Sequence, residues 1–163
     1  MSSHIVIVGA MGSGKTTLAR KLARALGRQF FDSDRSIRER TGRVGREVAE
    51  TEGVETLHRL ESEVLHETLA GSTPGVVAAA ASAIEDPAVR EALEDTYCIW
   101  VTADPEILAE RSAQGDHRRP VGGAERLQRR IPLFEQAADL VVDTGVLSAD
   151  ESVERVLAAI GAQ

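Results

Sequence analysis

Apolar and polar residues follow two different periods along the chain. Residues 4–8 read HIVIV, a short run rich in β-branched side chains that is typical of a buried parallel strand. Leu18, Leu22 and Leu26 then recur at helical spacing, and Gly27 suits the end of that helix. Further strands are predicted around residues 30–31 and at residues 75–80, 97–102 and 140–142. Strands that alternate with helices predict an α/β fold, in which helices cover the faces of a parallel sheet.

One helical stretch is too long to be a simple connection between neighbouring strands. Residues 36–69 lie between the second and third predicted strands, and we expect this helical region, about 33–70, to hold a substrate. Asp86 and Pro87 read as the N-cap and first residue of a separate helix that runs through Leu93. The chain shows no internal repeat and no linker, so we expect one domain over residues 1–163.

The composition narrows the possible functions. Hydrophobic residues make up 42% of the chain and charged residues 28%, as in globular proteins. A net charge of −7 argues against nucleic acid or an anionic membrane as a partner, because no excess positive field attracts polyanions. No apolar run approaches the roughly 20 residues that span a bilayer, and the N-terminus does not read as a secretory signal. Cys98 is the single cysteine; it excludes an internal disulfide, is expected to be a buried strand residue and favours a cytoplasmic location.

Residues 9–16 carry the most specific chemical signal. They read GAMGSGKT and fill the phosphate-binding pattern GxxxxGK, followed by Ser or Thr, without a mismatch. The strand, loop and helix stand in the required order, which disfavours the alternative of a glycine-rich turn with an incidental lysine. We expect Lys15 to reach the outer phosphates of ATP and the Thr16 hydroxyl to hold Mg²⁺. The other expected nucleotide-binding residues are Gly12, Ser13, Gly14, Thr17 and Arg111.

A second constellation follows the short strand around residues 30–31. Asp32 and Asp34 stand just beyond its carboxyl end, where open α/β sheets bind their ligands. One carboxylate can hold Mg²⁺, and the other can accept the proton or orient the hydroxyl of an acceptor alcohol. The alternative is that Ser33 or Asp34 caps a helix that starts near Ile37.

Residues 113–123 have the composition of a closing lid. Glycines stand at both ends of the segment, and Arg118 and Arg119 are adjacent within it. A lid needs flexible ends, and phosphoryl transfer needs cations that arrive over the moving phosphate, so Arg119 is a candidate catalytic residue. A solvated loop with surface arginines is the alternative.

Several short segments together resemble the shikimate kinase family in their order and spacing. They are residues 9–16, 32–34, 40–42, 52–53, 59–61, 119–120 and 130–133, and the resemblance covers nearly the whole chain. It implies a P-loop NTPase with the nucleoside-monophosphate-kinase fold, a five-stranded parallel sheet flanked by helices and a lid. It also implies transfer of the ATP γ-phosphate to an alcohol, with Asp32 serving Mg²⁺ and Asp34 contacting the acceptor hydroxyl. Arg119 and Arg130 would contact phosphate and the acceptor's carboxylate.

The chain departs from that family in the part that would bind the acceptor. Where the family has GExxFR, residues 53–58 read GVETLH, so its glutamate, phenylalanine and arginine become Val54, Leu57 and His58. A second pocket phenylalanine aligns with Ala49. Arginine binds a carboxylate through two parallel hydrogen bonds and is always charged, whereas histidine offers fewer donors and can be neutral.

A further departure follows the third predicted strand. Three glycines of the family align here with Ala80, Ala81 and Ser82, whose Cβ atoms would crowd a ligand that lies against the backbone. Together with the lost phenyl rings, these residues predict an acceptor of different shape and weaker anionic character than shikimate.

The helical pattern gives three further candidates for acceptor binding, which are His58, Glu61 and Arg130. His58 falls beside Glu61 on the inward half of its helix, so it either contacts a ligand or packs in the core. Arg130 shares an inward face with Phe134, while Arg129 points away. An inward arginine without a partner would be costly, which favours a pocket role for Arg130.

The sequence therefore predicts a kinase that uses ATP and Mg²⁺ to phosphorylate a small hydroxylated metabolite and that acts as a monomer. A genuine shikimate kinase is the nearest alternative. An ATP-binding regulator or pseudokinase is disfavoured because it would need neither Asp32 nor Asp34. A nucleoside-monophosphate kinase is weakened by the absence of a recognisable base-binding motif.

Overall fold

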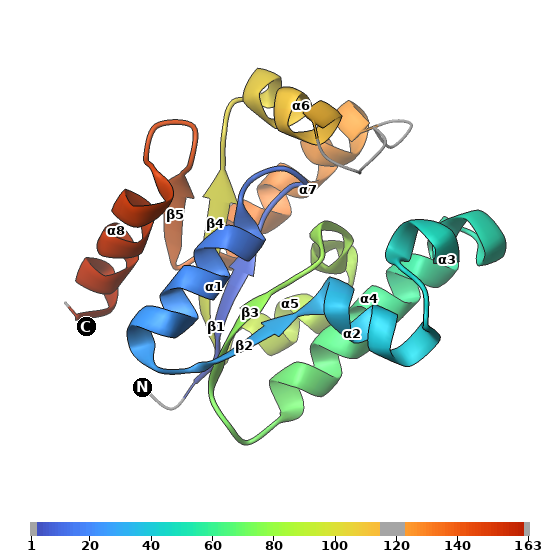
Figure 1. The fold of residues 1–163 in the computed structure, drawn as a ribbon, viewed down its shortest axis with the longest axis horizontal. Helices are drawn as coiled ribbons and strands as arrows, with labels where there is room; N and C mark the ends of the chain where they lie inside the picture. Colours follow the sequence, from blue (N-terminus) through green and yellow to red (C-terminus); the bar gives the residue numbers. More distant parts are fainter. Residues whose placement is uncertain (1–2, 115–122, 162–163) are drawn as a thin grey trace.

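The computed structural model describes residues 3–114 and 123–161, and within them it contains one parallel sheet. The sheet has five strands in the order β2-β3-β1-β4-β5 (Figure 1). Their bounds are Ile5–Val8 for β1, Gln29–Asp32 for β2, Gly75–Ala78 for β3, Tyr97–Thr102 for β4 and Leu140–Asp143 for β5. Every neighbouring pair is parallel, so the predicted α/β architecture with a five-stranded parallel sheet is confirmed.

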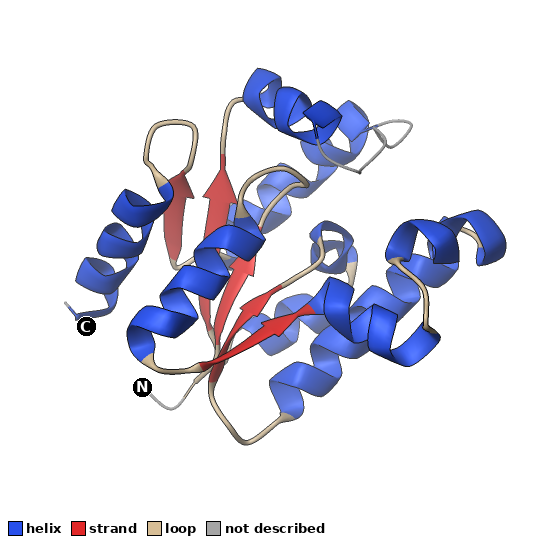
Figure 2. Ribbon diagram, viewed as in Figure 1, coloured by secondary structure: helices blue, strands red, loops and turns tan. Residues whose placement is uncertain are grey.

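Helices cover both faces of this sheet (Figure 2). The α-helices are α1 Lys15–Leu26, α2 Ser33–Thr41, α3 Gly45–Glu52, α4 Val54–Ala70, α5 Pro87–Leu93, α6 Pro105–Gln114, α7 Gly123–Ala137 and α8 Ala149–Gly161. A short 3-10 helix, η1, spans Ala81–Glu85 between β3 and α5. No helix in the described ranges is both long and apolar enough to cross a bilayer. The predicted lid at 113–123 falls almost entirely on residues 115–122, outside the described residues, and Arg119 lies there too.

The central strand explains why the phosphate loop has a fixed position. Ile5 and Ile7 of β1 pack into one core cluster with residues of α1 and α8. Val6 and Val8 point to the opposite face, into a second cluster with residues of α4, α5 and α7. All four side chains are buried, and each contributes about 1.5–3 kcal/mol of burial free energy. A slip of one residue would exchange the two faces, so the register of β1 holds the start of the loop in place.

Helices α2, α3 and α4 have a small core of their own. Ile37, Val48 and Val64 form a separate buried cluster, one residue from each helix. Arg40 of α2 adds ion pairs to Glu63, at 3.3 Å, and to Glu67, both on α4. Figure 1 shows α2 and α3 at the right of the view, far from α8 on the left. This helical region is therefore attached to the sheet through α4 and the end of β2.

Two local predictions from the sequence are wrong. The third strand ends at Ala78 instead of residue 80, because the chain turns there into η1. Helix α2 begins at Ser33 instead of near Ile37, and its N-cap is Asp32, whose carboxylate accepts a hydrogen bond from the Asp34 N–H at 3.0 Å.

Two other predictions are confirmed. The Asp86 carboxylate accepts a hydrogen bond from the Ala88 N–H at 2.9 Å and so caps α5, which carries Pro87 at its start. Cys98 is fully buried in β4.

Candidate active site

The phosphate loop joins β1 to α1 and depends on glycine at three positions. Gly9, Gly12 and Gly14 have φ angles of +149°, +79° and +94°, which L side chains rarely adopt. A Cβ at Gly9 would also overlap the carbonyl oxygen of Val101 in β4, and one at Gly12 would lie 3.0 Å from the Ser112 hydroxyl. This glycine-dependent path is the kind that lets a backbone close around an anion at a helix N-terminus.

Side chains from two other segments hold the loop in this conformation. Arg111 of α6 donates to the Gly12 carbonyl at 3.2 Å and to the hydroxyl and carbonyl oxygens of Thr144 at 3.0 and 2.8 Å. The Thr144 hydroxyl in turn donates to the Ser13 carbonyl at 2.6 Å. The Ser13 hydroxyl is buried and has no hydrogen-bond partner among the described residues. Buried hydroxyls are nearly always paired, so an oxygen of a ligand in the loop would satisfy it.

Lys15 lies at the first turn of α1 and faces the loop. Its ammonium group donates to the carbonyl oxygens of Gly9 and Ala10, both at 2.8 Å. Burial lowers the pKa of Lys15 to about 8, against the opposing effect of the Asp34 and Glu61 carboxylates. Phosphate oxygens can take over the two carbonyl contacts and would restore the charge on the ammonium group. The loop, the Ser13 hydroxyl and Lys15 therefore fit the polyphosphate of ATP.

The two carboxylates at the end of β2 lie in different settings. Asp32 caps α2, and burial together with the neighbouring charge of Asp34 raises the pKa of Asp32. The negative charges of both carboxylates raise the pKa of Lys15 and so partly offset the effect of its burial. Thr16, the next residue along α1, is partly exposed, and Thr17 is exposed.

These oxygen ligands suit magnesium. No group of three or more His, Cys, Asp and Glu side chains in the described ranges is arranged to hold a metal ion. Mg²⁺ in kinases needs no such group, because it keeps several waters and binds one or two side-chain oxygens plus substrate phosphates. A hydroxyl from Thr16 and a carboxylate from Asp32 fit that donor set.

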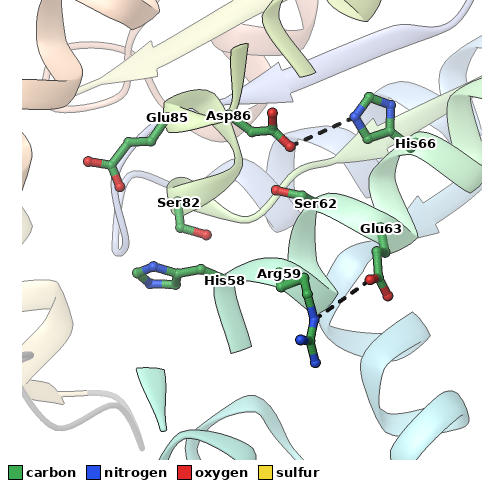
Figure 3. Close-up of a pocket in the computed structure, with 8 residues that line it drawn as sticks. All are labelled: His58, Arg59, Ser62, Glu63, His66, Ser82, Glu85 and Asp86. Carbon is green, nitrogen blue, oxygen red and sulfur yellow. Dashed lines mark ion pairs between the residues drawn. The ribbon is translucent and has the colours of Figure 1, made fainter. Parts of the chain in front are cut away.

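A cleft of about 300 Å³, lined by polar and charged residues, opens between α4 and the segment from η1 to the start of α5 (Figure 3). We call it the α4–η1 cleft. From α4 it is lined by His58, Arg59, Ser62, Glu63 and His66, and from the other side by Ser82, Glu85 and Asp86. His58, Ser62 and His66 recur every four residues, so they form one stripe along α4. The cleft is therefore framed by the two segments in which the chain departs from the family pattern.

Glu61 connects this cleft to the phosphate loop. Its carboxylate accepts a hydrogen bond from the Ser82 hydroxyl at 2.9 Å. Burial raises the pKa of Glu61 to about 7; Asp34 raises it further, while Ser82, Arg130 and Lys15 lower it. An acid with such a pKa can exchange a proton near neutral pH, which is common at functional sites.

His58 lies at the wall of the cleft and not in the core. Its side chain is half-buried and extends sideways from α4, below Ser82 in the view of Figure 3. Burial lowers the pKa of His58, and the positive charges of Arg130 and Arg126 lower it further. A pKa below the ordinary value favours the neutral imidazole at pH 7. His58 is therefore not a core residue, and a contact with the acceptor stays a prediction.

Arg130 of α7 is directed inward, as predicted, and its partner is an acid that the sequence analysis missed. Its side chain is 11% exposed, against 67% for Arg129. The Nη2 group of Arg130 donates to Glu85 Oε2 at 3.1 Å, and Arg129 approaches the other Glu85 oxygen at 3.6 Å. The Nε group of Arg130 is buried and has no hydrogen-bond partner in the described part of the chain.

Ala80, Ala81 and Ser82 form the turn from β3 into η1. Ala80 has φ −63° and ψ 144°, an extended conformation, and the next two residues are buried. Each of the three carries a Cβ atom, and none of them has positive φ. The backbone here therefore follows an ordinary path that does not depend on glycine.

The fold and the phosphate loop define the class of protein. A phosphate loop after the central strand of a parallel sheet, with carboxylates at the end of β2, which lies beyond β3 in the same sheet, is an arrangement that suits a P-loop kinase. The family model described as shikimate kinase matches residues 11–161. The chain belongs to the shikimate kinase family, and it is an ATP-dependent small-molecule kinase that uses ATP and Mg²⁺.

Relatives and solved structures agree with this assignment. Shikimate kinase of Symbiobacterium thermophilum is 38% identical over 164 residues, covering 94% of both chains. Shikimate kinase of Mycobacterium avium is 34% identical over 151 residues, covering 88% of this chain and 85% of the relative. The structure of shikimate kinase from Acinetobacter baumannii in complex with shikimate superposes with a TM-score of 0.88 at 28% identity, over 98% of this chain and 93% of that one.

Proposed function

We propose that this kinase transfers the γ-phosphate of ATP to a hydroxyl of a small metabolite whose shape and charge differ from those of shikimate. The observation that carries the proposal is that Glu61 links the phosphate loop to the cleft. The Lys15 ammonium of the phosphate loop is acted on by Asp34 and by Glu61, and Glu61 is bonded to Ser82 at the α4–η1 cleft. A hydroxylated molecule in that cleft would thus lie beside a nucleotide in the loop.

The proposed roles follow from these positions. Lys15 and the loop residues Gly12, Ser13 and Gly14 would stabilise negative charge on the phosphates, with Thr17 and Arg111 at the nucleotide. Thr16 and Asp32 would hold Mg²⁺, which neutralises phosphate charge when bound.

Asp34 would orient the acceptor hydroxyl and take its proton. Arg119, which lies outside the described residues, would add a cation from the lid. Catalysis would then rest on positioning and electrostatics, without a covalent intermediate.

Two observations support a changed acceptor. His58 is neutral where the family pattern has an arginine, which removes a permanent positive charge from the cleft wall. Ala80, Ala81 and Ser82 place Cβ atoms where glycines would leave backbone open to a ligand. The loss of one charge-assisted hydrogen bond weakens carboxylate binding by about 1.5–3 kcal/mol.

Shikimate itself is the second candidate acceptor. It is favoured by the names of the relatives and by the shikimate bound in the Acinetobacter baumannii structure. A chain that is 38% identical to a shikimate kinase can tolerate substitutions in its pocket.

An ADP-release assay over a panel of alcohols tests the proposal. The panel contains shikimate and its amino analogue, gluconate, cyclitols, hydroxy-amino acids and nucleoside monophosphates. We expect one or more alcohols other than shikimate to raise ADP release above the acceptor-free rate. Turnover of shikimate with a KM below about 1 mM would overturn the changed acceptor and leave the kinase assignment intact. If no acceptor raises the rate while ATP still binds, the result favours the alternative of an ATP-binding regulator.

A further inference from the structure

The charged groups around the α4–η1 cleft are already paired with one another. Glu85 lines the cleft and receives the Arg130 Nη2 group at 3.1 Å. Arg130 is 11% exposed and Glu85 is 32% exposed, so the pair is largely shielded from water. A shielded ion pair is stronger than one on the surface, and a ligand carboxylate would have to displace Glu85 to use the same donor.

The pairing leaves Arg130 with a restricted set of free donors. A carboxylate is bound best by two parallel N–H groups on one edge of the guanidinium group. Here Nη2 is engaged by Glu85, while Nε is buried without a partner among the described residues. Glu85 therefore occupies one of the two nitrogens on the Nε–Nη2 edge that a carboxylate would use, and the remaining Nε–H on that edge can serve a single hydroxyl or carbonyl oxygen.

The other charged groups in and near the cleft do not restore a site for an anion. Asp34 and Glu61 bring negative charge from the phosphate-loop side, and both act on Lys15. Arg59 lines the cleft but is 67% exposed and lies 3.7 Å from Glu63. Arg126 is half-buried and acts on His58, and Arg129 approaches Glu85 at 3.6 Å but is 67% exposed. Exposed cations are hydrated and screened, so they contribute much less to ligand binding than a shielded guanidinium group.

We infer that Glu85 determines acceptor specificity: it takes the place of an acceptor carboxylate on Arg130, and the acceptor is an uncharged polyhydroxylated molecule. This inference rests on the proposed kinase function and narrows its substrate class. An uncharged polyol offers hydroxyl oxygens to the Arg130 Nε–H group and hydroxyl protons to Glu61 and Asp34. It would bind without breaking the pair between Arg130 and Glu85.

Shikimate and its methyl ester form a matched pair of probes, because they carry the same hydroxyls and differ in one negative charge. Binding of each is measured by calorimetry in the presence of ADP and Mg²⁺. Glu85→Gln is expected to tighten shikimate binding at least tenfold and to change methyl ester binding less than threefold. Glu91→Gln removes an exposed acid from α5 and is expected to change neither.

Two further measurements keep the outcome interpretable. Glu85→Asp keeps the negative charge and is expected to bind shikimate more weakly than the methyl ester, as the native chain does. This comparison does not depend on whether Glu85→Gln folds well. Unchanged shikimate binding in a folded Glu85→Gln variant, or native binding of shikimate that is tighter than that of the ester, would overturn the inference. Failure of the proposed function has a different signature: no uncharged or acidic polyol raises ADP release, although ATP binds.

Discussion

The nucleotide end and the acceptor end of the site are built in different ways. The phosphate loop consists of consecutive residues whose backbone geometry depends on Gly9, Gly12 and Gly14. The acceptor end is assembled from α2, α4, η1 and α7, and it depends on side-chain contacts between residues far apart in sequence. A backbone device tolerates little variation, because a Cβ atom in the wrong place closes it. A site built from side-chain contacts can change its specificity through one or two substitutions. The departures of this chain from its family lie in that part of the site, at residues 53–58 and 80–82.

Burial shifts the pKa of one group at each end of the site, in opposite directions. It lowers the pKa of Lys15 to about 8 and raises the pKa of Glu61 to about 7, so each group is less strongly charged than it would be in water. Each also stabilises the charge of the other. A phosphate bound at the loop would favour the charged form of Lys15. A ligand hydroxyl at the cleft would lie near Glu61, which is about half protonated at neutral pH. The two ends are therefore coupled electrostatically.

Asp34→Asn is expected to have the largest effect, because it removes the group that would take the acceptor proton. The turnover number should fall about 10³-fold, within the range of lost general-base catalysis. ATP binding should persist, since the loop and Lys15 are untouched. ADP release measures the first effect and calorimetry with ATP the second. Loss of ATP binding in a folded variant would contradict the division into two ends.

Variants of Asp32 test whether this residue both holds Mg²⁺ and caps α2. Asn caps helices as well as Asp, so Asp32→Asn should leave α2 stable while it lowers activity about 10²-fold and raises the Mg²⁺ concentration required. Asp32→Ala should lose a similar amount of activity and also about 1 kcal/mol of stability. Activity is measured against Mg²⁺ concentration, and stability by denaturant unfolding. Full activity of Asp32→Asn at ordinary Mg²⁺ would leave Asp32 as a helix cap alone.

Glu61 makes the stability of the nucleotide-free protein depend on pH. Its pKa in the folded state, about 7, lies above the ordinary value of 4.5, so the folded protein binds the proton more tightly than the unfolded chain does. This contribution is fully present below about pH 4.5 and is lost as the pH rises through about 7. Relative to Glu61→Gln, the native chain should lose between about 1 and 3 kcal/mol of unfolding free energy from pH 5 to pH 8. Parallel pH profiles of the two proteins would contradict the burial of a titrating acid.

The parts of the molecule that the sequence predicts well are those encoded by neighbouring residues. The β-branched run before Gly9 predicts the central strand, and the loop pattern itself predicts nucleotide binding. Strand β4 matches residues 97–102 because it is a continuous apolar run between polar turns. The end of β3 was less predictable, since the apolar residues up to Ala80 continue after the strand stops pairing at Ala78.

The acceptor end is less readable because its partners are distant along the chain. Glu85 and Arg130 are separated by 45 residues, and neither position by itself indicates the other. The cost of an unpaired inward arginine did signal that a partner exists, but not which acid it is. The start of α2 is a milder case, in which Asp32, Ser33 and Asp34 are all good capping residues, and the extended backbone at Asp32 decides between them.

Ser82→Ala probes the hydrogen bond that joins the cleft to Glu61, beside the carboxylates proposed to serve catalysis. The Ser82 hydroxyl donates to the Glu61 carboxylate at 2.9 Å and favours its charged form, so loss of this bond should raise the pKa of Glu61 above about 7. A hydrogen bond to a charged group is worth about 1.5–3 kcal/mol at most, and water can replace part of it, so a rise of about one pH unit is expected. NMR titration of the Glu61 side chain measures it. Ser62→Ala is the matched control, since Ser62 lines the same cleft without a bond to Glu61. An equal shift in both variants would assign the perturbed pKa to burial alone and would separate the acceptor end from the phosphate loop.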